Sequence, residues 1–323
     1  MGTYRFILAV MVLLSHVSIN TFNFYIGVVA VVNFLMISGY LNTYLLETYY
    51  QENKNLKMFY FDRLCRILPQ YYFYFFLIIF INFFIDIKKD LIFLDIILEF
   101  PIILSGYHML FDNLFGIWFN VKINPPTWSL GLELTFYIII PFIILFLKKY
   151  LKIFLVTSLI FYLLICFFNY RTDTLGYRLI PGTLYIFLIG SYFYYTDFNK
   201  SFFLKSLSLI LLISIIIIFS YDKYYIARFS KEIAIGVFFG LFFLNFLKKK
   251  KQNKIDLFLG NLAYGVFLNH FFVIEIFNWY FEMNIILKIT LILIISMSLS
   301  YFSYTFIEVY ASNLRKKIRY NFK

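Results

Sequence analysis

Two ionisable side chains, Arg5 and His16, lie in one apolar run near the start of the chain. They are eleven residues apart. A helix turns by about 100° and rises by about 1.5 Å per residue, so the two side chains share one face within about 20° and lie about 16 Å apart along the axis. Because a buried arginine in a membrane helix costs about 2.5–3.5 kcal/mol and a neutral histidine less, the pair calls for an explanation, and a site for a long ligand that runs from the cytoplasm to the middle of the membrane would give one. The alternative is a snorkelling arginine and a histidine that hydrogen-bonds a neighbouring helix.

Two further arginines, Arg63 and Arg66, precede Pro69 where a later apolar run begins. Their i, i+3 spacing makes them neighbours on one helix face. Guanidinium groups match phosphate oxygens, and the free amides at a helix start add further donors, so the pair predicts an anion site. Anchoring at the cytoplasmic side of a membrane is the alternative.

An acid, Glu133, lies about one turn into another apolar run, after the pair Pro125 and Pro126. Acids inside membrane segments face the interior of the bundle or a watery cavity and indicate function. Neither Lys nor Arg stands at i±3 or i±4 from it. We therefore expect its partner on another helix, and His16 is a candidate. Trp128 suits the membrane interface as well as the wall of a site.

Several other polar residues have a strong structural alternative. Ser38 and Gly39 are small residues that allow close helix packing. Tyr264 and His270 lie on the same late apolar run. His270 either transfers protons as a second catalytic residue or, as we favour, makes a structural hydrogen bond.

The cysteine and histidine counts argue against a metal centre. Cys65 and Cys166 lie far apart, which excludes a disulfide scaffold and a cysteine-rich metal site. With three histidines in the chain, we expect no metal.

The elements that hold these side chains are predicted to be membrane helices. The 323 residues are 62% hydrophobic and 14% charged, with a mean hydropathy of +0.81, whereas a soluble domain is about 25% charged. Apolar runs of about 17–25 residues recur throughout, which is the length that crosses a bilayer. We expect an all-α polytopic membrane protein, residues 1–323 forming a single domain, with about ten spans near 4–19, 25–46, 63–85, 128–147, 153–169, 178–195, 203–220, 231–247, 257–279 and 285–307.

One apolar segment, residues 91–110, contains Asp95, Glu99 and Pro101. Counting it as a crossing would place the run "KKKKQNK" outside, against the rule that Lys and Arg gather on the cytoplasmic side. We therefore predict a re-entrant or surface segment near 91–127.

The location of positive charge predicts the orientation. The net charge is +12, and 19 of the 29 Lys and Arg residues lie in loops assigned to the inside, against 9 outside. This asymmetry indicates an orientation in the membrane with both termini in the cytoplasm. Because the positive charge is explained by this orientation, we expect no nucleic-acid partner. The first run lacks a small-residue cleavage site, so we expect a retained span. A bias toward Ile, Phe, Tyr, Asn and Lys indicates a bacterial, AT-rich genome and hence the bacterial cytoplasmic (inner) membrane.

Taken in order, these motifs resemble the acyltransferase-3 family of bacterial membrane O-acyltransferases. The resemblance covers nearly the whole chain and rests on the Arg-x10-His pair, "NFLMISG", "RLCRILPQY", "WSLGLELTFYIIIP" and "YGVFLNH". Two positions depart from the family: Tyr310 replaces a proline after Glu308, and Ala263 stands where serine is usual.

The resemblance implies transfer of an acyl group, usually acetyl from acetyl-CoA or another acyl-CoA, to a hydroxyl of a cell-surface or exopolysaccharide sugar. It implies His16 as general base assisted by Glu133, with Tyr264 and His270 as possible secondary residues. The residues implied in binding the donor are Arg5, Arg63, Arg66, Ser38, Trp128 and Tyr71. The expected partners are acyl-CoA, a carbohydrate or lipid-linked glycan, and membrane lipids.

Two alternatives stay open at this point. One keeps the chemistry and changes the acceptor to a lipid, a peptidoglycan sugar or a small glycoside. The other is a transporter or exporter of an anionic lipid-linked or acylated glycan, with the arginines lining its path. A purely structural membrane protein is least favoured, because it gives no reason for Arg5 and His16 to share a face.

Overall fold

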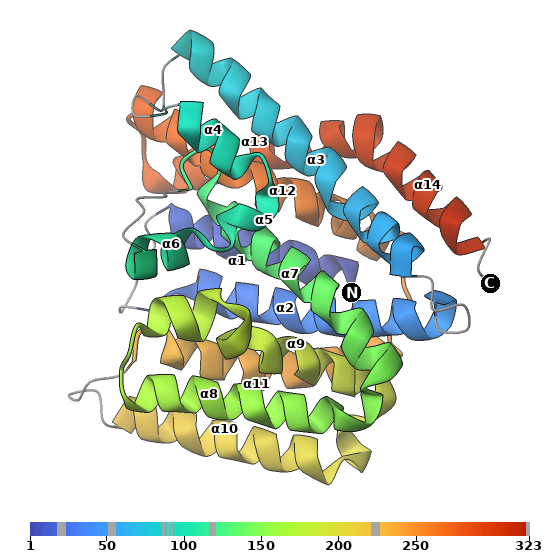
Figure 1. Ribbon diagram of the computed structural model, residues 1–323. Coiled ribbons are helices and arrows are strands. Elements are labelled where there is room, and N and C mark those ends of the chain that lie inside the picture. Colours follow the sequence, from blue (N-terminus) through green and yellow to red (C-terminus); the bar gives the residue numbers. More distant parts are fainter. Residues whose placement is uncertain are drawn as a thin grey trace. The chain divides into compact units, whose positions relative to one another are not determined.

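The structure is a computed structural model that describes residues 1–17, 24–50, 56–85, 88, 91, 93–115, 121–220 and 227–320. All regular structure in these residues is helical, as Figure 1 shows. Each expected span coincides with a helix, although the last residues of the first span lie outside the described part. The long helices are α1 (Gly2–His16), α2 (Ile26–Leu45), α3 (Leu56–Ile85), α7 (Trp128–Phe146), α8 (Leu151–Phe167), α9 (Ile180–Tyr195), α10 (Phe202–Ser220), α11 (Ser230–Lys249), α12 (Lys254–Tyr280) and α13 (Ile285–Ser303).

Seven helices of the described part are long and apolar enough to cross a membrane. The shorter helix α1 and residues 202–216 of α10 are apolar as well. The fold is therefore that of an all-α polytopic membrane protein. After α13 the chain continues through a π-helical turn, η7 (Tyr304–Glu308), into α14 (Val309–Tyr320).

The segment expected not to cross is confirmed as non-crossing. It holds three short helices, α4 (Phe93–Glu99), α5 (Ile102–Ser105) and α6 (His108–Phe115). None approaches the roughly 20 residues that a helix needs to span a bilayer. The 3-10 turn η3 (Pro125–Thr127) then leads into α7, and residues 92 and 116–120 lie outside the described part.

Glu99 ties the segment of α4, α5 and α6 to the chain before α7. Its carboxylate accepts backbone N–H groups from Lys122 at 2.5 Å, Ile123 at 2.9 Å and Asn124 at 3.4 Å. Lys122 also pairs with Asp95 at 3.0 Å. Burial raises the pKa of Glu99 to about 7, although the three N–H groups oppose the rise. The acids that looked anomalous in an apolar stretch thus hold the chain in place before α7.

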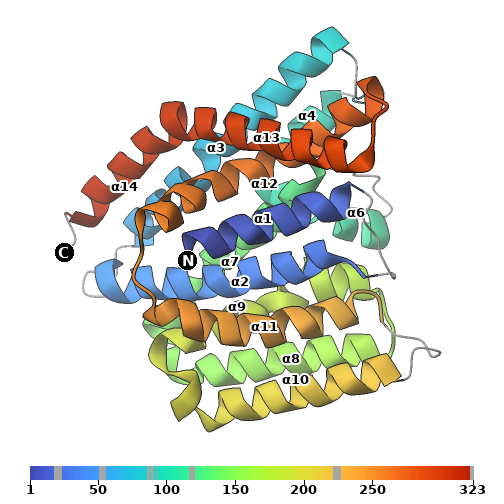
Figure 2. The same ribbon diagram turned by 180° about the vertical axis from the view of Figure 1, so that it is seen from behind.

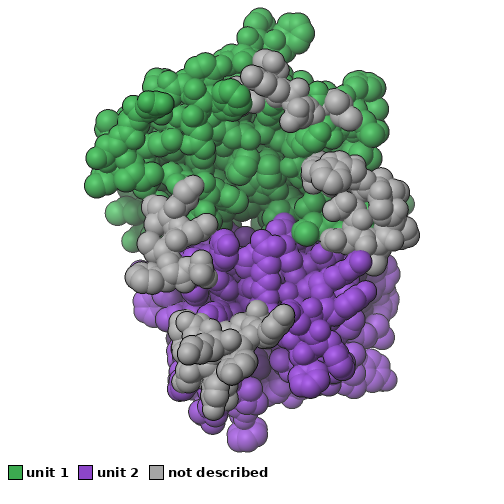
Figure 3. All heavy atoms as spheres, turned by 90° about the vertical axis from the view of Figure 1, so that its left-hand side faces the viewer, with its two compact units in different colours: residues 1–19, 57–131, 252–323 green, residues 20–56, 132–251 purple. Residues whose placement is uncertain are grey.

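The chain forms two compact units, coloured separately in Figure 3. The first comprises residues 1–19, 57–131 and 252–323, and within it α12 packs against both α1 and α13 (Figure 2). The second comprises residues 20–56 and 132–251. Within the second unit α9 packs against α2 and α8, and α11 packs against α2 and α10. The expectation that residues 1–323 act as one domain stays a prediction.

Helices α1 and α12 run parallel. The amine of Met1 pairs with the Asp256 carboxylate at 3.2 Å, 255 positions along the chain. At the other end of α1 the His16 ring lies 5.3 Å from the ring of Phe271. These two residues are also separated by 255 positions, so the two helices run in the same direction. A Cβ on Gly2 would lie 1.8 Å from the carbonyl oxygen of Asp256, so only glycine permits this approach.

Glycine also decides the packing of α2 on α9 in the second unit. A Cβ on Gly39 would lie 1.8 Å from the carbonyl oxygen of Phe187, and one on Gly190 would lie 1.9 Å from that of Met36. Real Cβ atoms do not approach so closely. The packing interpretation of Gly39 is confirmed, and it sets the position of Ser38 beside it.

Candidate active site

Arg5 and His16 both lie against α12, on the shared face that their spacing predicts. A Cβ on Gly260 would lie 3.3 Å from Nη2 of Arg5, so the guanidinium rests on this glycine. The His16 ring lies 5.4 Å from the ring of His270 and meets Phe271 edge-on. Because Gly260 and His270 are ten positions apart on α12, one pair of parallel helices holds the cation and the imidazole about three turns apart.

His270 itself is fully buried. Its Nδ1 lies 2.8 Å from the carbonyl oxygen of Phe267 and 3.2 Å from that of Val266. These contacts are the local hydrogen bonds that the sequence favoured for this residue.

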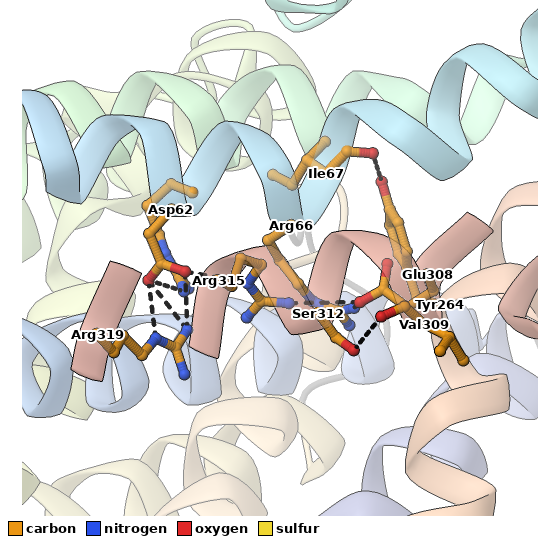
Figure 4. Close-up of polar contacts among 10 residues, drawn as sticks. Asp62, Arg66, Ile67, Tyr264, Glu308, Val309, Ser312, Arg315 and Arg319 are labelled. Carbon is orange, nitrogen blue, oxygen red and sulfur yellow. Dashed lines mark hydrogen bonds and ion pairs between the residues drawn. The ribbon is translucent and has the colours of Figure 1, made fainter. Parts of the chain in front are cut away.

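The arginines near the start of α3 belong to an ion-pair cluster with α14 (Figure 4). Asp62 has a fully buried side chain and accepts from Arg63 at 2.9 Å. It also accepts from Nε of Arg315 at 3.1 Å and from Nη2 of Arg319 at 3.0 Å. One carboxylate thus holds guanidinium groups from two helices that are distant in the sequence.

A second carboxylate extends the cluster. Glu308, in the π-helical turn η7, accepts from Arg66 at 2.5 Å and from Arg315 at 3.4 Å (Figure 4). The Arg66 guanidinium lies 5.0 Å from the centre of the Tyr264 ring, a cation–π distance. The Tyr264 hydroxyl donates to the carbonyl oxygen of Ile67 at 2.9 Å, which fixes that ring.

We call this group the arginine cluster; its members are Asp62, Arg63, Arg66, Glu308, Arg315 and Arg319. The expectation of help from amides at a helix start is wrong here. Helix α3 begins at Leu56, about two turns before Arg63. The guanidinium groups are instead oriented by two buried carboxylates, Asp62 and Glu308.

Sequence reasoning missed three members of this cluster: Asp62, Arg315 and Arg319. The available signal was the i, i+4 spacing of the two C-terminal arginines, which places them on one face of a helix. Their common partner on α3 is more than 250 positions away, and one sequence does not show such a pairing.

Glu133 lies on the part of α7 that belongs to the second unit. Its Oε1 accepts from the Ser38 hydroxyl at 2.6 Å and from the Tyr137 hydroxyl at 2.7 Å. Nδ2 of Asn42 donates to Oγ of Ser38 at 3.1 Å, so the Ser38 hydrogen is directed at the carboxylate. A partner on another helix was expected, and Ser38 of α2 is one. The pairing of Glu133 with His16 stays a prediction.

The structure places two further residues that are implied in donor binding, Tyr71 and Trp128. The Tyr71 hydroxyl is buried and donates to the carbonyl oxygen of Glu99 at 2.5 Å, which favours a role in holding the segment that contains α4. Trp128 is half-buried at the first position of α7. Their roles toward a donor stay predictions. The described residues contain no group of three or more His, Cys, Asp or Glu side chains that could hold a metal ion.

The fold is that of a membrane protein. Comparison with known families gives the class of protein: a family model described as an acyltransferase domain matches residues 3–305. The chain belongs to the acyltransferase-3 family, as its motifs predicted, and is a membrane acyltransferase. An uncharacterized protein of Aquifex aeolicus (strain VF5) is 35% identical over 205 residues, which cover 61% of this chain and 90% of that protein. No solved structure matches the chain significantly.

Proposed function

We propose that the protein transfers an acetyl group from cytoplasmic acetyl-CoA to a hydroxyl of a cell-surface or exopolysaccharide sugar. The observation that carries the proposal is the placement of Arg5 and His16 against the same helix, α12. Coenzyme A bears a diphosphate and a 3′-phosphate, which cannot enter hydrocarbon. Its arm is extended and uncharged, so a site with a cation at one end and an imidazole deeper along the same face matches its chemistry.

The proposed topology follows from the charge asymmetry. The protein lies in the bacterial cytoplasmic membrane with both termini in the cytoplasm. Arg5 and the arginine cluster then lie at the cytoplasmic end, where the phosphates of the donor must remain. Guanidinium groups match phosphate oxygens in geometry and charge, which makes this end of the protein suited to the phosphates of the donor.

His16 acts as general base in this mechanism. It takes the proton of the acceptor hydroxyl while that oxygen attacks the thioester carbonyl. The carbon–sulfur bond then breaks, the acyl group stays on the sugar, and the proton passes from His16 to the departing thiolate. In the proposal Glu133 orients the imidazole or stabilises its charged form, and Ser38 and Trp128 bound the acyl pocket.

Arg5→Gln tests the donor assignment. We expect it to raise the dissociation constant for acetyl-CoA at least tenfold, because a hydrogen bond to a charged group contributes about 1.5–3 kcal/mol and about 1.4 kcal/mol is tenfold in affinity. The measurement is titration of purified protein in detergent, followed by thermal shift or calorimetry. The acetyl thioester of N-acetylcysteamine, which lacks the phosphates, should bind both proteins equally.

Lys251→Gln is the matched control, because Lys251 is an exposed cation expected on the same side of the membrane. It should leave acetyl-CoA binding unchanged. Equal loss in both variants would reduce the effect to general electrostatics, and absence of any acetyl-CoA binding by the unmodified protein would favour a transporter.

A further inference from the structure

His270 presents a buried hydrogen-bond acceptor that the fold leaves unused. Both contacts of its Nδ1 are carbonyl oxygens, of Phe267 and Val266, and carbonyl oxygens only accept. Nδ1 therefore carries the hydrogen, and Nε2 carries the lone pair. That Nε2 atom is buried and has no hydrogen-bond partner among the described residues.

An unused buried acceptor is costly. Leaving such a group unsatisfied costs about 1–3 kcal/mol, so it needs an explanation in a packed helix interior. The hydrogen bonds of Nδ1 explain why a histidine is tolerated at this position. They do not explain the presence of Nε2, since a smaller side chain with one donor would satisfy the same carbonyl groups.

The neighbour of this ring is the proposed general base. The His16 and His270 rings have centroids 5.4 Å apart and are tilted by 34°. Two imidazoles joined by an N–H···N bond of about 3 Å, with each nitrogen about 1.1 Å from its ring centre, have centroids about 5.2 Å apart when the bond is linear. The observed separation is close to this value, although no ring nitrogen of His16 bonds Nε2 of His270 in the structure. A small turn of the His16 ring would bring its N–H onto Nε2.

We propose that His270 is the positioning residue of the reaction: its Nε2 accepts an N–H from His16 and so leaves the lone pair of His16 directed at the acceptor hydroxyl. The proposal rests on the proposed function of His16. It assigns to a neutral ring part of the role that was proposed above for Glu133.

Proton movement stays balanced in this scheme. The hydroxyl proton moves to the unprotonated ring nitrogen of His16 and later to the thiolate sulfur, as described above. His270 stays neutral throughout, because its own hydrogen remains on Nδ1 between the two carbonyl groups. When His16 is protonated, the bond between the rings becomes charge-assisted and therefore stronger, which stabilises the transition state more than the ground state.

Replacing His270 by phenylalanine keeps a ring and removes the acceptor, whereas glutamine keeps an acceptor near the place of Nε2. We expect His270→Phe to lower kcat by about 10- to 100-fold, the worth of one hydrogen bond to a charged group, with KM for acetyl-CoA unchanged. His270→Gln should recover most of kcat. Trp279→Phe, at an exposed ring of the same helix, is the control and should match the unmodified protein.

His16→Ala is measured in the same assay, and the thermal unfolding of every variant is measured as well. Full kcat in His270→Phe, or equal loss in the Phe and Gln variants at unchanged stability, overturns the positioning role while an inactive His16→Ala leaves the proposed function standing. Activity that survives in His16→Ala overturns the proposed function itself. A His270→Phe protein that fails to fold leaves the decision to His270→Gln, which must then keep most of kcat for the proposal to hold.

Discussion

Replacing His16 by alanine is expected to lower kcat for acyl transfer by about 10²–10⁴-fold, the usual contribution of a positioned general base. The acceptor hydroxyl is a poor nucleophile until its proton is removed, and His16 is the imidazole that α1 places against α12. This change should not alter the binding of the donor phosphates by Arg5, which lies about three helical turns away. The measurement is the initial rate of transfer by purified protein at saturating acetyl-CoA.

Donor binding supplies the control for that result. The His16→Ala protein should bind acetyl-CoA with an unchanged dissociation constant, because the phosphates lie at the other end of the proposed site. Loss of binding together with activity would indicate a folding defect. Full transfer with intact binding would contradict the assignment of His16 as base.

Replacing Asp62 by alanine is expected to cost about 3–5 kcal/mol of stability, because it removes the carboxylate from a buried set of ion pairs and leaves buried positive charge without the partner that Asp62 supplied. Its side chain is fully buried and serves Arg63, Arg315 and Arg319. The loss should appear as a lower midpoint of thermal unfolding. It should also appear as faster proteolysis of α14, since two of the three arginines tie that helix to α3.

Asp197 offers the comparison. It pairs with Lys248 at 3.1 Å, but its side chain is 37% exposed, and exposed pairs contribute about 0–1 kcal/mol. Asp197→Ala should therefore leave the unfolding midpoint nearly unchanged. Equal effects of the two substitutions would show that the arginine cluster does not stabilise the packing of α14.

Most of the fold could be predicted from the sequence, because membrane helices are specified by local composition. The runs that became α2 and α12 are apolar for the length of a bilayer, and no folding partner is needed to recognise them. Residues 91–110 are almost as apolar, and the lysine run that follows α11 decided that they do not cross. The helix bounds were less well predicted: α3 starts at Leu56, ahead of its apolar part.

The candidate site was predicted only where one helix holds both residues. The shared face of Arg5 and His16 follows from helix geometry, and the structure places both against α12. The ion pairs of Asp62 join α3 to α14, and the hydrogen bond of Ser38 joins α2 to α7. Such contacts depend on tertiary packing, so sequence analysis could name Ser38 and Glu133 as candidates but not pair them, and it missed Asp62.

The central claim is that donor acetyl groups enter from the cytoplasm and leave on carbohydrate. Its most direct test uses acetyl-CoA labelled in the acetyl group and sealed vesicles from cells that carry or lack the gene, with the label followed into the polysaccharide fraction. The account predicts labelled carbohydrate when the donor is added to inside-out vesicles with the gene, none in right-side-out vesicles, and none with His16→Ala. Labelling that is independent of the gene, or equal in both vesicle orientations, would contradict it.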